Sequence, residues 1–204
     1  RKVSAAGLIF IGPNPESMKI LGSKTASRKL MIKNNIPVVP GFKSNSNDIN
    51  EYISAAKNIG YPILIKAADG GGGKGMRVVN NEEMLAESIN AAKRESLSAF
   101  GSEEIFLEKY IKSPRHIEFQ VAGDKHGNYI HLFERECSIQ RRHQKIIEET
   151  PSVALDDELR TKMGKTAVEV VKAAGYDNIG TVEFLLDDDK NFYFLEVNAR
   201  LQVE

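Results

Sequence analysis

The sequence predicts an α+β fold in which antiparallel hairpins alternate with amphipathic helices. Short apolar runs, separated by turn residues, recur along the chain, and segments with apolar residues at helical spacing lie between them. Hairpins separated by helices favour antiparallel sheets over a doubly wound parallel sheet. A length of 204 residues suffices for a core and for one or two domains.

The elements of the first half follow from apolar runs, caps and breakers. A buried strand is expected at 7–11, and one or two helices at 16–35 with Ser23 as a cap before Lys24. Pro37 and Pro40 indicate a linker. The remaining expected elements are a helix at 46–59, strands at 62–66 and 76–79, a helix at 82–99 and a strand at 105–110.

The second half contains two predicted hairpins on either side of a long helix. The first hairpin joins 117–123 to 128–135, and the second joins 181–186 to 191–196. The helix between them covers 156–174, with Asp156 as its cap. With a turn near Asp189 and Lys190, Glu183 lies opposite Glu196 in the second hairpin.

That opposition of two carboxylates suggests a cation. Like charges directly opposite on a sheet are destabilising, and a bound Mg²⁺ or Mn²⁺ would remove the cost. A one-residue slip would place Glu183 on the other face.

The last nine residues alternate polar and apolar side chains. In an extended strand the polar ones share one face, and the apolar residues 197, 199, 201 and 203 share the packing face. Carboxylates with an amide suit a hard divalent cation, and a guanidinium suits a planar anion. A solvated strand face is the alternative. The polar face consists of Glu196, Asn198, Arg200, Gln202 and Glu204.

A glycine-rich segment follows the strand that ends at Lys66. Gly70, Gly72 and Gly75 satisfy G-x-G-x-x-G, but a strand rather than a helix is expected next, so a dinucleotide site is not favoured. A P-loop fails because Ala68 and Gly75 occupy its glycine and Ser/Thr positions. A flap over nucleotide phosphates remains, with Lys66 as a phosphate contact, and a flexible surface turn is the alternative.

A second cluster of charge lies between 137 and 149. Arg141, Arg142, His143 and Lys145 could bind phosphate or carbonate, and a solvated loop is the ordinary alternative. No aromatic residue is interleaved for base stacking, which disfavours nucleic acid. Cys137 lacks a local motif for thiol catalysis, so we expect a buried structural cysteine.

Composition argues against several classes of protein. Lysine plus arginine and aspartate plus glutamate both number 28, so no global charge favours a nucleic acid or a basic partner. No apolar run approaches the roughly 20 residues of a membrane span. One cysteine excludes an internal disulfide framework and fits a reducing compartment, cytoplasmic or, in a eukaryote, the mitochondrial matrix.

Together the motifs resemble the ATP-grasp superfamily and, within it, the biotin carboxylases. The likeness extends over essentially the whole chain in family order, and the two motifs at 140–145 and 198–204 are its most specific parts. The matching stretches are Phe10-Ile-Gly-Pro13, Lys24, Lys66 with the segment 70–79, Glu108-Lys-Tyr110, Pro114-Arg-His-Ile-Glu118, Gln140-Arg-Arg-His-Gln-Lys145 and the segment 196–204.

The resemblance implies a set of nucleotide and metal contacts. Mg²⁺ or Mn²⁺ would be bound by Glu183 and Glu196, with Asn198 nearby. ATP would be contacted at its phosphates, ribose and adenine by Lys24, Lys66, Gly72, Gly73, Glu108, Lys109, Ile111, His116, Gln140 and His143.

It also implies an activity, MgATP-dependent carboxylation of biotin by bicarbonate. Bicarbonate would be surrounded by Lys145, Arg200, Gln202 and the Val203 backbone, with Glu204 as the base. The expected partners are a biotin carboxyl carrier, a carboxyltransferase of the acetyl-CoA or propionyl-CoA type, as in fatty acid biosynthesis, and a second copy in a homodimer. There are two alternatives. One is another ATP-grasp ligase, such as a relative of carbamoyl phosphate synthetase, and the other is a non-catalytic ATP-binding module.

The resemblance further divides the chain into segments. It assigns 1–22 to the end of an N-terminal domain, 23–40 to a helical linker, 41–110 to the flap subdomain and 111–204 to the first part of the catalytic subdomain. On this basis the ATP-grasp fold is expected to be truncated at both ends.

Overall fold

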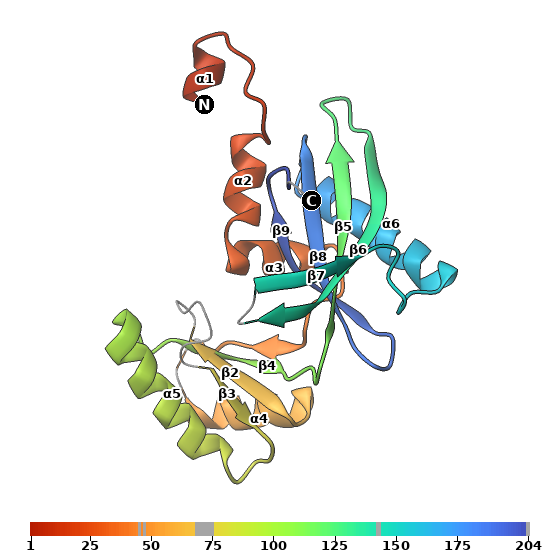
Figure 1. Cartoon of the computed structure of the whole chain (residues 1–204). Helices are drawn as coiled ribbons and strands as arrows, with labels where there is room; N and C mark the ends of the chain where they lie inside the picture. Colours follow the sequence, from red (N-terminus) through yellow and green to blue (C-terminus); the bar gives the residue numbers. More distant parts are fainter. Residues whose placement is uncertain (45, 47, 68–75, 142–143, 203–204) are drawn as a thin grey trace. The chain divides into compact units, whose positions relative to one another are not determined.

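A computed structural model describes residues 1–44, 46, 48–67, 76–141 and 144–202 (Figure 1). The chain forms two compact units, one of residues 39–112 and one of residues 1–38 with 113–204. The expected segments 1–22 and 23–40 therefore belong largely to the same unit as the second half of the chain.

The unit of residues 39–112 is a small antiparallel sheet with two helices. The strand order is β1-β4-β2-β3, and buried apolar residues of β2 and β4 form its core with residues of both helices. The elements are β1 (Gly41–Phe42), α4 (Ile49–Ile59), β2 (Ile63–Ala67), β3 (Arg77–Val79), α5 (Leu85–Phe100) and β4 (Ile105–Lys109).

Capping groups define the ends of α4. The Asp48 side chain accepts a hydrogen bond from the Asn50 amide at 3.0 Å, and Gly60 follows the last turn at φ 77°, a value that favours glycine. The Lys109 ammonium donates to the carbonyls of Gly60 and Tyr61, at 2.9 Å each. A cation at the C-terminal end of a helix satisfies carbonyls that have no partner within the helix.

The larger unit is built on a five-stranded antiparallel sheet in the order β7-β6-β5-β8-β9. Helices α2 and α3 precede it, and Ser23 caps α3 as expected, with its hydroxyl accepting from the Ala26 amide. The elements are α1 (Lys2–Ala5), α2 (Pro15–Leu21), α3 (Lys24–Lys33), β5 (Arg115–Gly123), β6 (Tyr129–Arg141), β7 (Gln144–Glu149), α6 (Asp157–Ala173), β8 (Ile179–Leu186) and β9 (Phe192–Asn198).

The two faces of this sheet differ in character. On β5, Ile117 and Phe119 are fully buried beside Phe184 of β8, and these residues share one hydrophobic core with α6, which lies against the same face (Figure 1). His116 and Glu118 alternate with them and therefore point to the other face. One face thus holds the fold together, and the opposite face carries polar side chains.

The predicted α+β class with antiparallel sheets is confirmed, as are all the predicted helices and hairpins, with shifts at their ends. Asp156 caps α6 through a hydrogen bond from the Leu159 amide at 2.8 Å. Strand β7 was not predicted, because its first residues are polar and show no period-2 pattern. Strand β6 is also longer than expected and ends at Arg141.

The strand expected at 7–11 is wrong. Residues 8–10 have no regular structure, and Ile9 and Ile11 are 85% and 95% exposed. A strand forms only where a neighbouring strand takes its backbone hydrogen bonds, and no strand of the described residues pairs with this segment. An apolar run therefore does not by itself make a strand.

The difference between buried and exposed phenylalanines can be measured. Phe119, fully buried with its ring 6.3 Å from that of Phe184, should lose about 3–5 kcal/mol of unfolding free energy when replaced by alanine. Phe133 on β6 is 62% exposed, and Phe133→Ala should cost no more than about 1 kcal/mol. Urea denaturation followed by circular dichroism compares the two, and equal losses would contradict the assignment of the core face.

Candidate functional site

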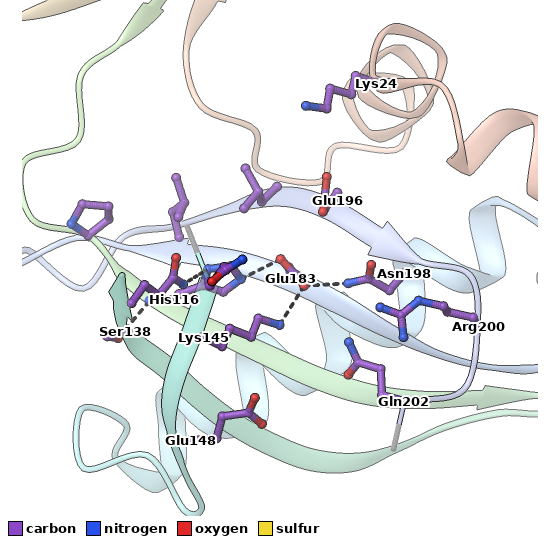
Figure 2. A pocket seen from close by; sticks show the side chains of 15 residues that line it. Lys24, His116, Ser138, Lys145, Glu148, Glu183, Glu196, Asn198, Arg200 and Gln202 are labelled. Carbon is purple, nitrogen blue, oxygen red and sulfur yellow. Dashed lines mark hydrogen bonds and ion pairs between the residues drawn. The ribbon is translucent and has the colours of Figure 1, made fainter. Parts of the chain in front are cut away.

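The polar face of the larger sheet forms an open pocket of about 830 Å³ (Figure 2). Residues of α3, β5, β6, β7, β8 and β9 and of the segment after β9 line it, so it is built entirely within one unit. The lining residues are Lys24, Pro114, His116, Ser138, Gln140, Gln144, Lys145, Glu148, Glu183, Leu185, Leu195, Glu196, Asn198, Arg200 and Gln202.

A row of charged side chains crosses four neighbouring strands. In the strand register, Arg135 of β6 lies directly opposite Glu118 of β5. Glu118 also lies opposite Glu183 of β8, and Glu183 lies opposite Glu196 of β9. Glu118 and Glu183 are only 0% and 4% exposed. Two buried carboxylates on adjacent strands repel each other and lose hydration, so the fold requires positive charge beside them.

Lys145 of β7 supplies part of that charge. Its ammonium contacts Glu118 and lies 3.1 Å from Glu183 Oε1, so it bridges the two carboxylates. Burial alone would lower the pKa of Lys145, but the hydrogen bonds and charges of these carboxylates raise it. Lys145 is therefore a fixed cation at neutral pH.

Glu183 accepts two further hydrogen bonds. His116 Nε2 lies 2.6 Å from its Oε2, and Asn198 Nδ2 lies 2.6 Å from its Oε1. Gln140 Nε2 donates both to the Cys137 carbonyl and to His116 Nδ1, which assigns the imidazole proton to Nε2. Burial alone would raise the pKa of Glu183, but the hydrogen bond from His116 and the charge of Lys145 hold it well below its usual range.

A bulge places Glu196 in the pocket. Phe184 pairs with Phe194, yet Glu183 pairs with Glu196, so Leu195 is an extra residue in β9. The predicted opposition of Glu183 and Glu196 is confirmed, but it depends on this bulge, because a regular ladder would place Leu195 opposite Glu183. The two carboxylates and the Asn198 amide offer the oxygen ligands that Mg²⁺ and Mn²⁺ prefer. This donor set fits a divalent cation, and its role as a metal site stays a prediction.

The alternating segment 196–204 is only partly a strand. β9 ends at Asn198, and Leu201, expected to pack, is 70% exposed. That part of the prediction is wrong, because residues 199–202 lie outside the ladder and do not alternate across a sheet. Asn198, Arg200 and Gln202 nevertheless all line the pocket, as the pattern predicted.

The residues expected to contact ATP lie in both units. Lys24, His116 and Gln140 line the pocket, and Figure 2 shows Lys24 on its helix opposite the sheet. The other described residues of this set belong to the unit of residues 39–112, where the Lys66 ammonium on β2 contacts the Glu108 carboxylate on β4. Lys109 binds backbone carbonyls, and Ile111 is half-buried. Five predicted site residues lie outside the described residues, namely Gly72, Gly73, His143, Val203 and Glu204.

Sequence reasoning gave no role to two residues of the charged row, Glu118 and Arg135. The period-2 pattern of β5 could have placed Glu118 on the face of His116. No local pattern indicates that Arg135 faces Glu118, because their pairing depends on a register between strands that contains a bulge.

Comparisons with known proteins identify the family of the chain. Residues 23–204 match the family described as the carbamoyl-phosphate synthase L chain, ATP-binding domain. The chain belongs to this family. The resemblance to biotin carboxylases is also confirmed by relatives of that name.

Two relatives and one solved structure illustrate the likeness. The chain is 53% identical over 198 residues to the mitochondrial methylcrotonoyl-CoA carboxylase subunit alpha of Dictyostelium discoideum, covering 97% of this chain and 28% of that protein. It is 51% identical over 197 residues to biotin carboxylase 2 of Bacillus subtilis, covering 97% and 44%. The biotin carboxylase domain dimer of Hydrogenobacter thermophilus 2-oxoglutarate carboxylase, in complex with MgADP, ADP and bicarbonate, superimposes with a TM-score of 0.81 at 46% identity, covering 100% and 45%.

The chain thus spans less than half the length of the relatives that it matches. The ATP-grasp fold expected from the resemblance is confirmed by structures of this kind. None of the described helices combines the length and apolar character that a membrane span requires.

Removing the cation between the carboxylates should destabilise the protein. Lys145→Met leaves Glu118 and Glu183 without the ammonium that bridges them, and we expect a loss of about 3–5 kcal/mol of unfolding free energy at pH 7. Adding Glu118→Gln should recover part of this loss, because one buried charge is then removed. Urea denaturation of both variants measures the effect, and a double variant no more stable than Lys145→Met would contradict the bridging role.

Cys137 should behave as an inert thiol. It is fully buried, and burial with the nearby charge of Glu118 raises the pKa of its thiol to about 12. The reactive thiolate is therefore scarce at pH 8. Alkylation by iodoacetamide, followed by mass spectrometry, should be at least about 100-fold slower in the native protein than in guanidinium. Rapid native labelling would show a reactive cysteine.

Proposed function

We propose that this chain is the ATP-binding part of a biotin carboxylase, an ATP-dependent ligase that carboxylates biotin with bicarbonate. The observation that carries the proposal is the coexistence in one pocket of a fixed cation, Lys145, an exposed guanidinium, Arg200, and the opposed carboxylates Glu183 and Glu196. Lys145 and Arg200 suit an oxyanion, and Glu183 and Glu196 suit a divalent cation. The bicarbonate, ADP and MgADP bound by the Hydrogenobacter thermophilus domain support the same assignment.

In this proposal Lys145, Arg200 and Gln202 hold bicarbonate with the Val203 backbone, and Glu204 takes its proton. A bicarbonate oxygen attacks the γ-phosphorus of ATP and ADP leaves, which gives carboxyphosphate. Bound Mg²⁺ or Mn²⁺, held by Glu183, Glu196 and Asn198, would neutralise phosphoryl charge.

Biotin is carboxylated in the second step. Carboxyphosphate yields CO₂ and phosphate, the phosphate removes the N1 proton of biotin, and N1 attacks CO₂. Arg200 is exposed in the pocket and would stabilise the enolate-like oxygen of biotin during this step.

The remaining nucleotide contacts are assigned by resemblance. Lys24 and His143 would contact the phosphates, while His116 and Gln140 would lie by the ribose and phosphates. Of the residues in the unit 39–112, Lys66, Gly72 and Gly73 would contact the phosphates, and Glu108, Lys109 and Ile111 the adenine.

The partners belong to the proposal as well. Biotin would be presented on a carrier protein or domain, and a carboxyltransferase would consume the product. A homodimer is supported by the dimeric Hydrogenobacter thermophilus domain. The Dictyostelium discoideum relative is mitochondrial and the Bacillus subtilis relative is bacterial, so both the mitochondrial matrix and the cytoplasm fit as compartments.

Phosphate release from MgATP by the full-length protein tests this function. We expect release to require bicarbonate and to rise severalfold on addition of free biotin. Arg200→Ala should lower the biotin-stimulated rate at least about 100-fold, because it removes the guanidinium proposed to stabilise developing negative charge. Lys190→Ala, in the turn after β8, is the matched control and should retain the rate.

The name of the matched family favours one rival, a carbamoyl phosphate ligase. Such an enzyme would cleave ATP with bicarbonate but would not respond to biotin. Bicarbonate-dependent release without biotin stimulation would therefore move the assignment to this rival, and ATP binding without turnover would indicate a non-catalytic module.

A further inference from the structure

The side-chain amide of Gln202 is held in one orientation within the pocket wall. Gln202 is 7% exposed, and its Oε1 lies 2.6 Å from Arg135 Nη2 and 2.9 Å from Thr181 Oγ1. A more distant contact joins it to Gln120 Nε2 at 3.4 Å. The carbonyl end of the amide therefore points at three polar groups of neighbouring strands.

Of these groups only Arg135 decides the orientation. A threonine hydroxyl can donate or accept, and the Gln120 amide can turn over, so either would tolerate a reversed Gln202. A guanidinium only donates, so a reversed amide would place its NH₂ group against another donor. The hydrogen bond to Gln202 Oε1 is charge-assisted and stronger than a neutral one.

Arg135 itself has little freedom. Its Nε lies 2.6 Å from Glu118 Oε1 and 2.9 Å from Glu148 Oε2, and its side chain is 12% exposed. Burial alone would lower the pKa of Arg135, but the hydrogen bond and charge of Glu118 raise it, so the group stays a cation and a donor. The buried carboxylate Glu118 thus holds the arginine, and the arginine holds the amide.

We propose that Arg135 is a positioning residue, which turns the NH₂ group of Gln202 toward the pocket and so makes it a donor to bicarbonate. The inference rests on the proposed function. Figure 2 shows Lys145, Arg200 and Gln202 directed toward the same part of the pocket. With the amide oriented in this way, all three side chains present N–H groups there, which suits an anion and disfavours a neutral or cationic ligand.

The test is the KM for bicarbonate of the full-length protein, measured beside the KM for MgATP. Arg135→Met should raise the bicarbonate KM about threefold or more, because the Gln202 amide is no longer held with its NH₂ group toward the anion, and should change the MgATP KM less than twofold. Arg160→Met is the matched control. Arg160 binds the buried carboxylate of Glu134 at 2.8 Å and does not line the pocket, so this variant should lose thermal stability but keep its bicarbonate KM.

A second variant tests the direction of the hydrogen bond without disturbing the arginine. Gln202→Glu retains an oxygen for Arg135 but replaces the NH₂ donor with an acceptor, and should raise the bicarbonate KM at least about tenfold. Because the new carboxylate can also repel the anion, Gln202→Met, which removes the donor without adding charge, should raise the bicarbonate KM as well. If Gln202 is only structural, Gln202→Met keeps its bicarbonate KM.

A double variant shows whether Arg135 acts through Gln202. In a Gln202→Met background, Arg135→Met should change the bicarbonate KM less than twofold. Three results would each overturn the inference. The first is an undiminished effect of Arg135→Met in the Gln202→Met background. The others are an unaltered bicarbonate KM in the Arg135→Met variant or in the Gln202→Glu variant. Should Arg135→Met fail to fold, Arg135→Gln takes its place in both backgrounds, because a side-chain amide can donate or accept and so does not fix the orientation of Gln202. Wild-type protein with no bicarbonate-dependent cleavage would instead refute the proposed function and this inference with it.

Discussion

The larger unit depends on how two buried carboxylates on adjacent strands are neutralised. Glu118 and Glu183 pair directly across β5 and β8 on a face where little water reaches them. Lys145 and Arg135, on β7 and β6, supply the positive charge. Each of these cations compensates a buried carboxylate on a neighbouring strand. A shift of one strand would therefore leave a buried charge unpaired and alter the electrostatics of the pocket.

This arrangement prepares the pocket for charged substrates before they bind. Lys145 stays protonated, and Glu183 stays ionised since its pKa lies below its usual range. Dipoles and charges held in place by the fold need not reorganise when negative charge develops on a substrate. Arg200 and Lys24, by contrast, are exposed in the open part of the pocket, where Arg200 Nη1 lies 3.3 Å from the Leu201 carbonyl oxygen.

The separation of faces allows the sheet to carry both stability and chemistry. Phe119 and Phe184 pack on the side of α6, while their neighbours Glu118 and Glu183 point into the pocket. The bulge at Leu195 adapts the last strand to this division, since it places Glu196 opposite Glu183 while Phe194 and Val197 remain buried in the core. A bulge of this kind is a common way to redirect a side chain near a functional site.

The sequence alone determined the helices from α2 to α6, the β5–β6 and β8–β9 hairpins, the α+β class and much of the pocket lining. These features depend on periodicity, caps and turns, which are local, and on motifs whose residues lie close together in the chain. Lys145, Glu183, Asn198 and Gln202 were found in this way. Only the tertiary structure decided that β5 pairs with β8 and β6 with β7, and that the apolar run at 8–11 forms no strand. It also decided that Arg135 reaches both Glu118 and Gln202. Those contacts join residues far apart in the chain through the strand register, which local sequence does not specify where a ladder contains bulges.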